Sequence, residues 1–191
     1  MKITFNSPTV LGFTIACFIV MILDIATNSV STYELFCVYR APLTEPFTYI
    51  RFFGHVLGHA GWSHLIGNIM FILILGPLLE EKYGSKNILF VILTTALVTG
   101  IIQFIFFPDT RLLGASGVVF AFILLSSLTG NSKGEIPLTF ILVALIYIGQ
   151  QVYEGIFVND NVSNLTHIIG GIVGSVLGIV MNRNNMNRFK S

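Results

Sequence analysis

Six long segments without a formal charge dominate the pattern of polar and apolar positions along the chain. They cover residues 3–23, 52–79, 87–108, 112–132, 136–153 and 161–182. A helix needs about 20 mostly apolar residues to cross a bilayer core of roughly 30 Å. The segments are continuous mixtures of Leu, Ile, Phe and Val, without the alternation that is typical of a membrane β-barrel. Each segment therefore predicts one membrane-spanning helix.

The predicted fold is an all-α integral membrane protein that forms a single domain over residues 1–191. We expect its six helices near residues 9–25, 63–82, 87–106, 115–130, 136–153 and 165–182. The first of them could instead be a cleaved signal peptide. Only Lys2 precedes it, however, and no Ala-x-Ala cleavage site follows near Asp24, which favours a retained helix.

The distribution of Lys and Arg predicts the orientation in the membrane. With the N-terminus inside, the cytoplasmic segments hold seven basic residues and the outer segments hold three. Cytoplasmic loops normally carry the excess of basic residues, so this count favours both termini in the cytoplasm. The seven are Lys2, Lys82, Lys86, Lys133, Arg183, Arg188 and Lys190, and the three are Arg40, Arg51 and Arg111.

One connection is much longer than the others. Residues 26–62 contain Pro42, Pro46, several charges and many aromatic side chains, which rules out a clean span. Aromatic and arginine side chains together suit the membrane–water interface. The apolar content of this segment argues against disorder. We therefore expect a long interfacial first loop on the outer side.

The overall composition agrees with a membrane protein and excludes several other classes. The 191 residues are 54% hydrophobic and only 10% charged, whereas soluble domains carry about a quarter charged residues. The net charge of +1 makes a nucleic-acid binder a poor fit. Two cysteines, Cys17 and Cys37, cannot form a disulfide framework, and no Cys-x-x-Cys redox pair exists.

Polar residues inside predicted spans are costly and therefore mark candidate functional sites. His55, His59 and His64 cluster at the outer start of the second helix, and Asn68 follows His64 on the same helical face. In the predicted topology, Ser116 at the start of the fourth helix and His167 at the start of the sixth come to the same membrane side.

The spacing of small residues predicts which helices touch. Gly170, Gly174 and Gly178 recur every four residues below His167 on one face of the sixth helix. Gly117 and Ala121 form a matching pair on the fourth helix, next to Ser116. Small residues at this spacing allow membrane helices to approach closely. This contact would bring Ser116 towards His167.

A serine beside a histidine can cleave a peptide bond. The imidazole takes the hydroxyl proton during attack on a carbonyl and later gives it to the leaving amine. The oxyanion needs hydrogen-bond donors, for which His64, Asn68 and the Ser116 backbone N–H are candidates. No acidic residue lies in the outer half of either helix, so the pair would be a Ser–His dyad.

At this point the sequence resembles the rhomboid intramembrane serine proteases, in particular their bacterial GlpG type in its minimal six-helix form. Several separated motifs that run from the first loop to the last helix carry the resemblance. The first is Arg51, which falls where the family has a Trp-Arg pair. The others are the histidine-rich stretch His55, His59, His64 with Asn68, Glu80 with Gly84, Gly114-Ala115-Ser116-Gly117, and His167 with Gly170 and Gly174.

Three positions depart from the family pattern. Ile50 replaces the Trp of the Trp-Arg pair, and Thr166 precedes the histidine where Ala is usual. Phe120 stands where a Tyr commonly stacks beside the catalytic His, so the ring is kept and a hydroxyl is lost. None of these changes removes a group that the chemistry needs.

The resemblance implies an endopeptidase of the bacterial inner membrane that cleaves transmembrane segments of other membrane proteins near their outer end. Ser116 would be the nucleophile and His167 the general base, with His64, Asn68 and the Ser116 amide around the oxyanion. Water would reach the site from the outer side. The resemblance implies no metal, no organic cofactor and no nucleic-acid partner.

Other residues of the motifs receive accessory or structural roles. His55 and His59 order the first loop or hydrate the site, and Arg51 holds the loop by hydrogen bonds or reaches the interface. Glu80 is expected to bond at a helix end on the cytoplasmic side, far from the chemistry. Gly114, Gly117, Phe120, Gly170 and Gly174 would shape and support the site.

Three alternatives stay open at this stage. An intramembrane metalloprotease could use His55 and His59, although Val56 occupies the position of the general base. A small channel would need a polar path across the bilayer, whereas the inner halves of the helices are apolar. A catalytically silent rhomboid relative could bind membrane segments without cutting them. The sequons at Asn161 and Asn164 are interpreted as chance matches.

Overall fold

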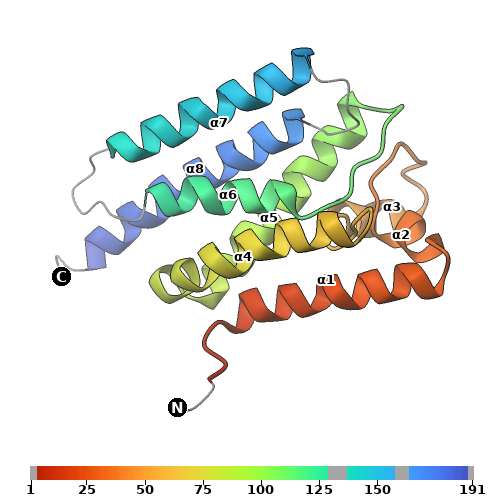
Figure 1. The fold of residues 1–191 in the computed structure, drawn as a ribbon, viewed down its shortest axis with the longest axis horizontal. Coiled ribbons are helices and arrows are strands. Elements are labelled where there is room, and N and C mark those ends of the chain that lie inside the picture. The colour runs from red at the N-terminus through yellow and green to blue at the C-terminus, as the bar shows by residue number, and fades with distance from the viewer. Residues whose placement is uncertain (1–3, 129–136, 158–163, 189–191) are drawn as a thin grey trace.

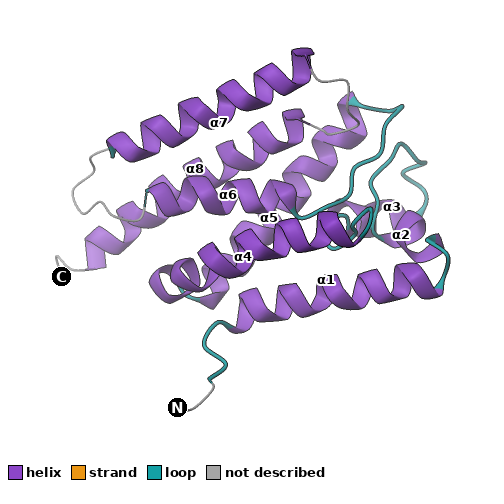
Figure 2. Cartoon of the chain, in the orientation of Figure 1, coloured by secondary structure: helices purple, strands orange, loops and turns teal. Residues whose placement is uncertain are grey.

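The computed structural model describes residues 4–128, 137–157 and 164–188, and over these residues it consists of helices joined by loops (Figure 2). Some predicted features lie outside them: residues 129–130 and 136 at helix ends, Lys2, Lys133, Lys190 and Asn161. Within the described ranges the chain forms eight helices: α1 (Pro8–Ala26), α2 (Val30–Leu35), α3 (Pro46–Gly54), α4 (Trp62–Tyr83), α5 (Ser85–Phe106), α6 (Ser116–Ser127), α7 (Leu138–Phe157) and α8 (Asn164–Arg188).

The six long helices correspond to the six predicted segments and alternate in direction along the bundle (Figure 1). Among the described residues, α1, α4 and α5 are long and apolar enough to cross a membrane. The apolar parts of the other three helices are shorter: Ser116–Ser127, Leu138–Gln150 and Leu165–Met181. The first loop and the start of α4 and of α6 lie at the same end of the bundle (Figure 1).

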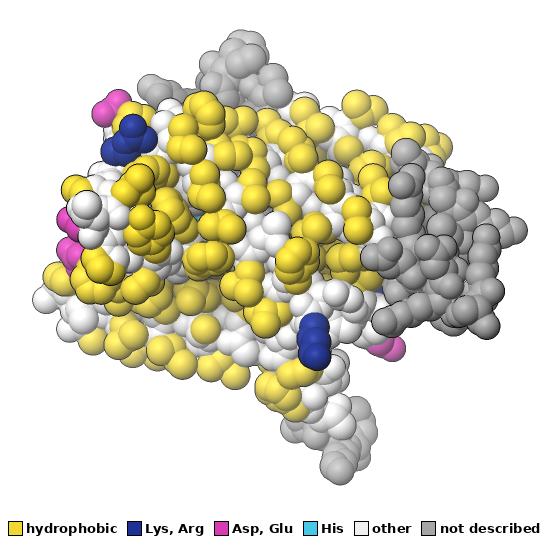
Figure 3. Space-filling view, turned by 180° about the vertical axis from the view of Figure 1, so that it is seen from behind, with side chains coloured by type: hydrophobic (Ala, Val, Ile, Leu, Met, Phe, Trp, Pro, Cys, Tyr) yellow, Lys and Arg dark blue, Asp and Glu magenta, His cyan; other side chains and the backbone are white. Residues whose placement is uncertain are grey.

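The outer surfaces of these helices are apolar, as expected for helices that face lipid. Ile15, Ile19 and Ile22 on α1 are more than half exposed, and Ile146 on α7 is 70% exposed. Hydrophobic side chains cover much of the face seen in Figure 3. A soluble monomer rarely exposes apolar surface on this scale. The chain is therefore a multi-pass membrane protein.

Glu80 fixes α1 against α4 at the end of the bundle away from the first loop. Pro8 begins α1, where its missing N–H costs no hydrogen bond. The next two backbone N–H groups, of Thr9 and Val10, each donate to the Glu80 carboxylate at 2.9 Å. A carboxylate at a helix N-terminus satisfies N–H groups that have no partner inside the helix.

The first loop contains two short helices, α2 and α3, that the sequence did not predict as helices. Pro46 begins α3, and the buried Arg51 near its end donates from Nε to the backbone oxygen of Glu34 at 2.9 Å. The same guanidinium lies 3.5 Å from the Glu34 carboxylate and 3.6 Å from that of Glu45. Arg51 thus ties α2, α3 and the intervening loop together.

The core centres on α6, which packs against α4, α5, α7 and α8. The largest buried cluster joins apolar side chains of α1, α4, α5 and α6, among them Val10, Leu65, Ile72 and Phe122. A second, smaller cluster lies under the first loop, where the rings of Phe52 and Phe104 meet edge to face at 5.4 Å. The central place of α6 gives the residues at its N-terminus a rigid support.

Candidate active site

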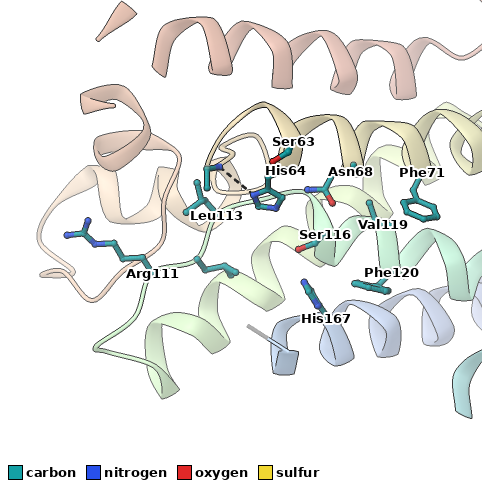
Figure 4. Close-up of a pocket in the computed structure, with 13 residues that line it drawn as sticks. Ser63, His64, Asn68, Phe71, Arg111, Leu113, Ser116, Val119, Phe120 and His167 are labelled. Atoms are coloured by element: carbon teal, nitrogen blue, oxygen red, sulfur yellow. Dashed lines mark hydrogen bonds between the residues drawn. The ribbon is translucent and has the colours of Figure 1, made fainter. Parts of the chain in front are cut away.

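A cavity of about 640 Å³ opens between the N-terminal ends of α4, α6 and α8 (Figure 4). Polar and apolar residues from all three helices, and from the loop before α6, line it. They are Ala60, Ser63, His64, Gly67, Asn68, Phe71, Arg111, Leu112, Leu113, Ser116, Val119, Phe120 and His167. Four of the polar residues that the sequence singles out, Ser116, His167, His64 and Asn68, therefore share one cavity.

Ser116 is the first residue of α6, and a sharp turn at Gly114 leads into it. Gly114 has a φ of +125°, a conformation that side chains with a Cβ rarely adopt. A Cβ at this position would also stand 2.7 Å from the His64 ring. The backbone N–H groups of the first turn of α6 have no acceptor within the helix and carry the positive end of its dipole. The hydroxyl of Ser116 thus lies beside a set of backbone donors.

Close packing of α8 against α6 places His167 on the wall of the cavity that Ser116 lines. A Cβ added at Gly170 would overlap the carbonyl oxygen of Gly117, and one at Gly174 would overlap that of Ala121. This is the contact that the glycine spacing predicts. In Figure 4 the ring of His167 is directed towards Ser116 at the cavity wall. Both side chains are half-buried.

Two aromatic rings support the imidazole of His167. The Phe120 ring lies 4.7 Å from it, centroid to centroid, and is inclined by 45°. Phe120 in turn stacks on Tyr147 of α7 at 4.2 Å. Tyr147 is a supporting residue that the sequence did not reveal, because its place next to Phe120 depends on how α7 packs.

His64 and Asn68 present hydrogen-bond donors beside Gly114 and Ser116. The Ala60 N–H donates to Nδ1 of His64 at 3.4 Å, drawn as a dashed line in Figure 4. Because Nδ1 accepts, the proton of the neutral ring belongs on Nε2, next to Gly114. The Asn68 amide nitrogen is buried and has no acceptor among the described residues. Because Asn68 also lines the cavity, this nitrogen is a donor that a group bound there could use.

His55 and His59 lie behind the loop that precedes Ser116 and do not line the cavity. His55 Nε2 lies 3.0 Å from the Ala96 carbonyl oxygen, and the His55 backbone oxygen accepts the Gly114 N–H at 2.9 Å. His59 Nε2 accepts the Ala115 N–H at 3.4 Å. Burial lowers the pKa of His55 to about 4, and burial with the nearby His64 lowers the pKa of His59 to about 4.

The first loop also contacts the loop before Ser116, at the same end of the bundle. Val38 and Leu112 exchange two backbone hydrogen bonds of 2.9 Å. The Arg111 guanidinium lies over the Tyr33 ring at 4.6 Å and points away from the cavity that its residue lines (Figure 4). No sequence motif indicates this role of Arg111, because cation–π contacts depend on loop geometry.

The remaining predicted residues are distributed through the fold rather than in the cavity. Arg51 holds the first loop together, and Glu80 caps α1 at the opposite end of the bundle. Gly117, Gly170 and Gly174 form the α6–α8 contact. Among the described residues, no three His, Cys, Asp or Glu side chains come together as a metal-binding group.

Comparisons with known proteins agree in pointing to one family. A family model described as the Rhomboid domain matches residues 46–184. Rhomboid-related protein 2 of Mus musculus is 31% identical in an alignment of 156 positions, which covers 71% of this chain and 52% of that protein. The chain thus spans about half the length of this relative.

Two bacterial relatives extend the comparison. Rhomboid protease GlpG of Haemophilus influenzae is 26% identical over 133 residues, covering 68% of each chain. The putative rhomboid protease YdcA of Bacillus subtilis is 27% identical over 134 residues, covering 65% of this chain and 63% of the relative. Since the matched domain runs from α3 into α8 and includes every helix that lines the cavity, this chain belongs to the rhomboid family.

Proposed function

We propose that this chain is an intramembrane serine endopeptidase in which Ser116 is the nucleophile and His167 the general base. The observation that carries the proposal is that both side chains line one cavity together with the donors of His64 and Asn68. The names of the bacterial relatives, which include the words rhomboid protease, support the same reaction class.

The reaction would follow the usual course of acyl transfer from a peptide. The Ser116 Oγ bonds to the scissile carbonyl carbon while His167 takes its proton. When the carbonyl re-forms, the C–N bond breaks and His167 gives the proton to the leaving amine. A water molecule, deprotonated by His167, then attacks the acyl-enzyme and releases Ser116. The cavity is rimmed by the exposed Ala60 and Ser63, through which water could enter from the first-loop end.

The oxyanion would be held by three donors on two helices. These are the Nε2–H of His64, the Nδ2 amide of Asn68 and the backbone N–H of Ser116. Fixed donors of this kind stabilise the tetrahedral intermediate without reorganising during the reaction. A third, acidic group is not required if the imidazole is oriented otherwise, and the contact of His167 with Phe120, which itself stacks on Tyr147, would supply that orientation.

The architecture proposed with this function is a single domain over residues 1–191 with six spans. We infer that α6, α7 and α8 cross the membrane together with α1, α4 and α5, because all six run alternately along one bundle (Figure 1). The excess of basic residues in the predicted inner segments favours both termini in the cytoplasm of a bacterial inner membrane. Substrates would be transmembrane segments of other proteins, cut near their outer end.

The test uses purified protein in detergent and a fluorescent fluorophosphonate, which bonds only to an activated serine. Wild type should be labelled on Ser116, and Ser116→Ala and His167→Ala should not. Ser63→Ala is the matched control, because Ser63 lines the same cavity and should not be needed for labelling. The same proteins are then given tagged single-span substrates, with and without a metal chelator.

Each outcome separates the candidates. Cleavage that resists the chelator and disappears in Ser116→Ala supports the serine protease. Cleavage that survives in Ser116→Ala and stops with the chelator would overturn the proposal in favour of a metalloprotease that uses histidines such as His55 and His59. A wild type that is neither labelled nor active would identify a silent relative that only binds membrane segments.

A further inference from the structure

Two consecutive peptide N–H groups immediately before Ser116 are held by residues of the segment that links α3 to α4. The Gly114 N–H donates to the His55 carbonyl oxygen at 2.9 Å, and the Ala115 N–H donates to Nε2 of His59 at 3.4 Å. The first bond needs only backbone, whereas the second depends on a side chain. His59 itself is buried and does not line the cavity.

The hydrogen bonds of His59 determine where its proton lies. Nδ1 stands 3.1 Å from the Leu57 carbonyl oxygen, which can only accept, so Nδ1 carries the proton. Nε2 then has a free lone pair, and this atom receives the Ala115 N–H. Only the neutral ring can make both bonds, and burial keeps the pKa of His59 well below neutrality, at about 4.

The position of Ala115 explains why this bond matters for Ser116. Ala115 is the N-cap of α6, and its N–H belongs to the peptide that follows Gly114, the residue with a φ of +125°. Because the Ala115 N–H donates to His59, the orientation of the peptide group between Gly114 and Ala115 is fixed. The next N–H groups, of Ser116 and Gly117, have no acceptor within the helix, and Ser116 lines the cavity.

We propose that His59 is a positioning residue that sets the peptide between Gly114 and Ala115 by accepting the Ala115 N–H, and thereby aligns the Ser116 hydroxyl and N–H. This inference rests on the proposed function. His59 touches neither the substrate nor the reacting atoms, and acts through Ala115 alone. Small displacements of reacting groups cost large factors in rate, on the order of 100-fold for 1 Å.

Three substitutions of His59 separate its acceptor atom from its bulk. In His59→Gln the side-chain oxygen reaches the place of Nε2 and can still accept from Ala115. In His59→Asn the oxygen reaches only the place of Nδ1, and in His59→Leu there is no acceptor. The measured quantities are the maximal rate and the half-saturating concentration of fluorophosphonate labelling at Ser116, together with the unfolding temperature in detergent.

We expect His59→Leu and His59→Asn to lower the maximal labelling rate about 10- to 100-fold with little change in half-saturation, and His59→Gln to stay within about threefold of wild type. Equal rates in all three variants and wild type would overturn the inference. So would a Gln variant as slow as the Leu variant, since the ring and not its acceptor would then matter. If wild type is not labelled at all, the proposed function has failed instead.

Discussion

Gly170 of α8 lies against the backbone of Gly117 of α6 so closely that a single added methyl group would overlap the Gly117 carbonyl oxygen. The neighbouring turn repeats this arrangement between Gly174 and Ala121. Because His167 is three residues before Gly170 and Ser116 is next to Gly117, this backbone contact sets the separation of the two proposed catalytic side chains.

Replacing Gly170 by alanine should therefore impair both stability and activity. The methyl group can be accommodated only if α8 moves away from α6, and overpacking of this kind costs about 1–3 kcal/mol. The shift would carry His167 away from Ser116, so fluorophosphonate labelling should fall by more than about tenfold at temperatures where the protein is folded. Thermal unfolding in detergent and labelling rates measure the two effects.

The matched control for this substitution is Gly12→Ala. Gly12 is also a helical glycine, on the exposed face of α1, and a Cβ there meets nothing within 4 Å. This variant should be neutral or more stable by up to about 1 kcal/mol, because alanine is the better helix former. Equal behaviour of Gly12→Ala and Gly170→Ala would show that the α6–α8 contact does not position His167.

A substitution at Glu80, unlike Gly170→Ala, should lower stability without lowering activity. Glu80→Gln keeps one carbonyl oxygen but turns an amide group towards the N–H donors of Thr9 and Val10. Hydrogen bonds to a charged group contribute about 1.5–3 kcal/mol, so the unfolding free energy should fall by about 1–3 kcal/mol. Glu80 is 16 residues beyond His64 on α4, about 24 Å along the helix axis.

Labelling of Ser116 below the unfolding temperature should therefore stay at the wild-type rate in Glu80→Gln. Glu81→Gln, at an exposed neighbouring position, is the control and should change the unfolding free energy by less than about 0.5 kcal/mol. A Glu80→Gln protein that is stable but slow would mean that the α1 anchor communicates with the cavity.

Local patterns in the sequence were sufficient for the six long helices and for the α6–α8 contact. An uncharged run of about 20 residues and a glycine at every fourth position are both local patterns with one dominant physical explanation in a membrane. For this reason the predicted segments 9–25 and 63–82 differ from α1 and α4 by only one residue at each end.

The structural features that could not be predicted from the sequence depend on contacts between distant residues. The helices α2 and α3 are short, and only the ties of Arg51 to Glu34 and Glu45 explain their arrangement. Tyr147 supports His167 through Phe120, a chain of ring contacts across three helices. The bond from Ala115 to His59 joins residues 56 positions apart and has no counterpart in any motif spacing.

The two buried histidines of the outer segment predict a loss of stability in mild acid. An unfolded histidine titrates near pH 6.5, whereas burial lowers the pKa of His55 and of His59 to about 4. Between these values the unfolded chain binds more protons, so the free energy of unfolding falls as the pH is lowered from 6.5 and levels off below 4. Each histidine accounts for up to about 3 kcal/mol.

Unfolding temperatures in detergent between pH 7.5 and 4 measure this dependence. His59→Gln removes one titrating group while keeping an acceptor for Ala115, so between pH 6.5 and 4 its unfolding free energy should fall by up to about 3 kcal/mol less than that of wild type. Carboxylates that titrate in the same window contribute equally to both proteins and cancel in the difference. An unchanged pH dependence in His59→Gln would mean that this ring is not kept neutral by burial.

Asn68 should be important for catalysis and unimportant for folding, which is an unusual combination for a buried polar residue. Its amide nitrogen has no acceptor among the described residues, so removing it in Asn68→Ala breaks no hydrogen bond made by that donor in the resting protein. In the proposed reaction the same nitrogen meets the oxyanion, and the loss of one such donor typically costs about 10²–10³ in rate. We expect fluorophosphonate to label Ser116 about 100-fold more slowly in Asn68→Ala than in wild type, while the unfolding temperature stays within a few degrees of the wild-type value.

If the labelling rate and the stability of Asn68→Ala fall together, the amide is a structural group whose partner forms only in the membrane. The oxyanion would then have to be held by His64 and the α6 backbone alone.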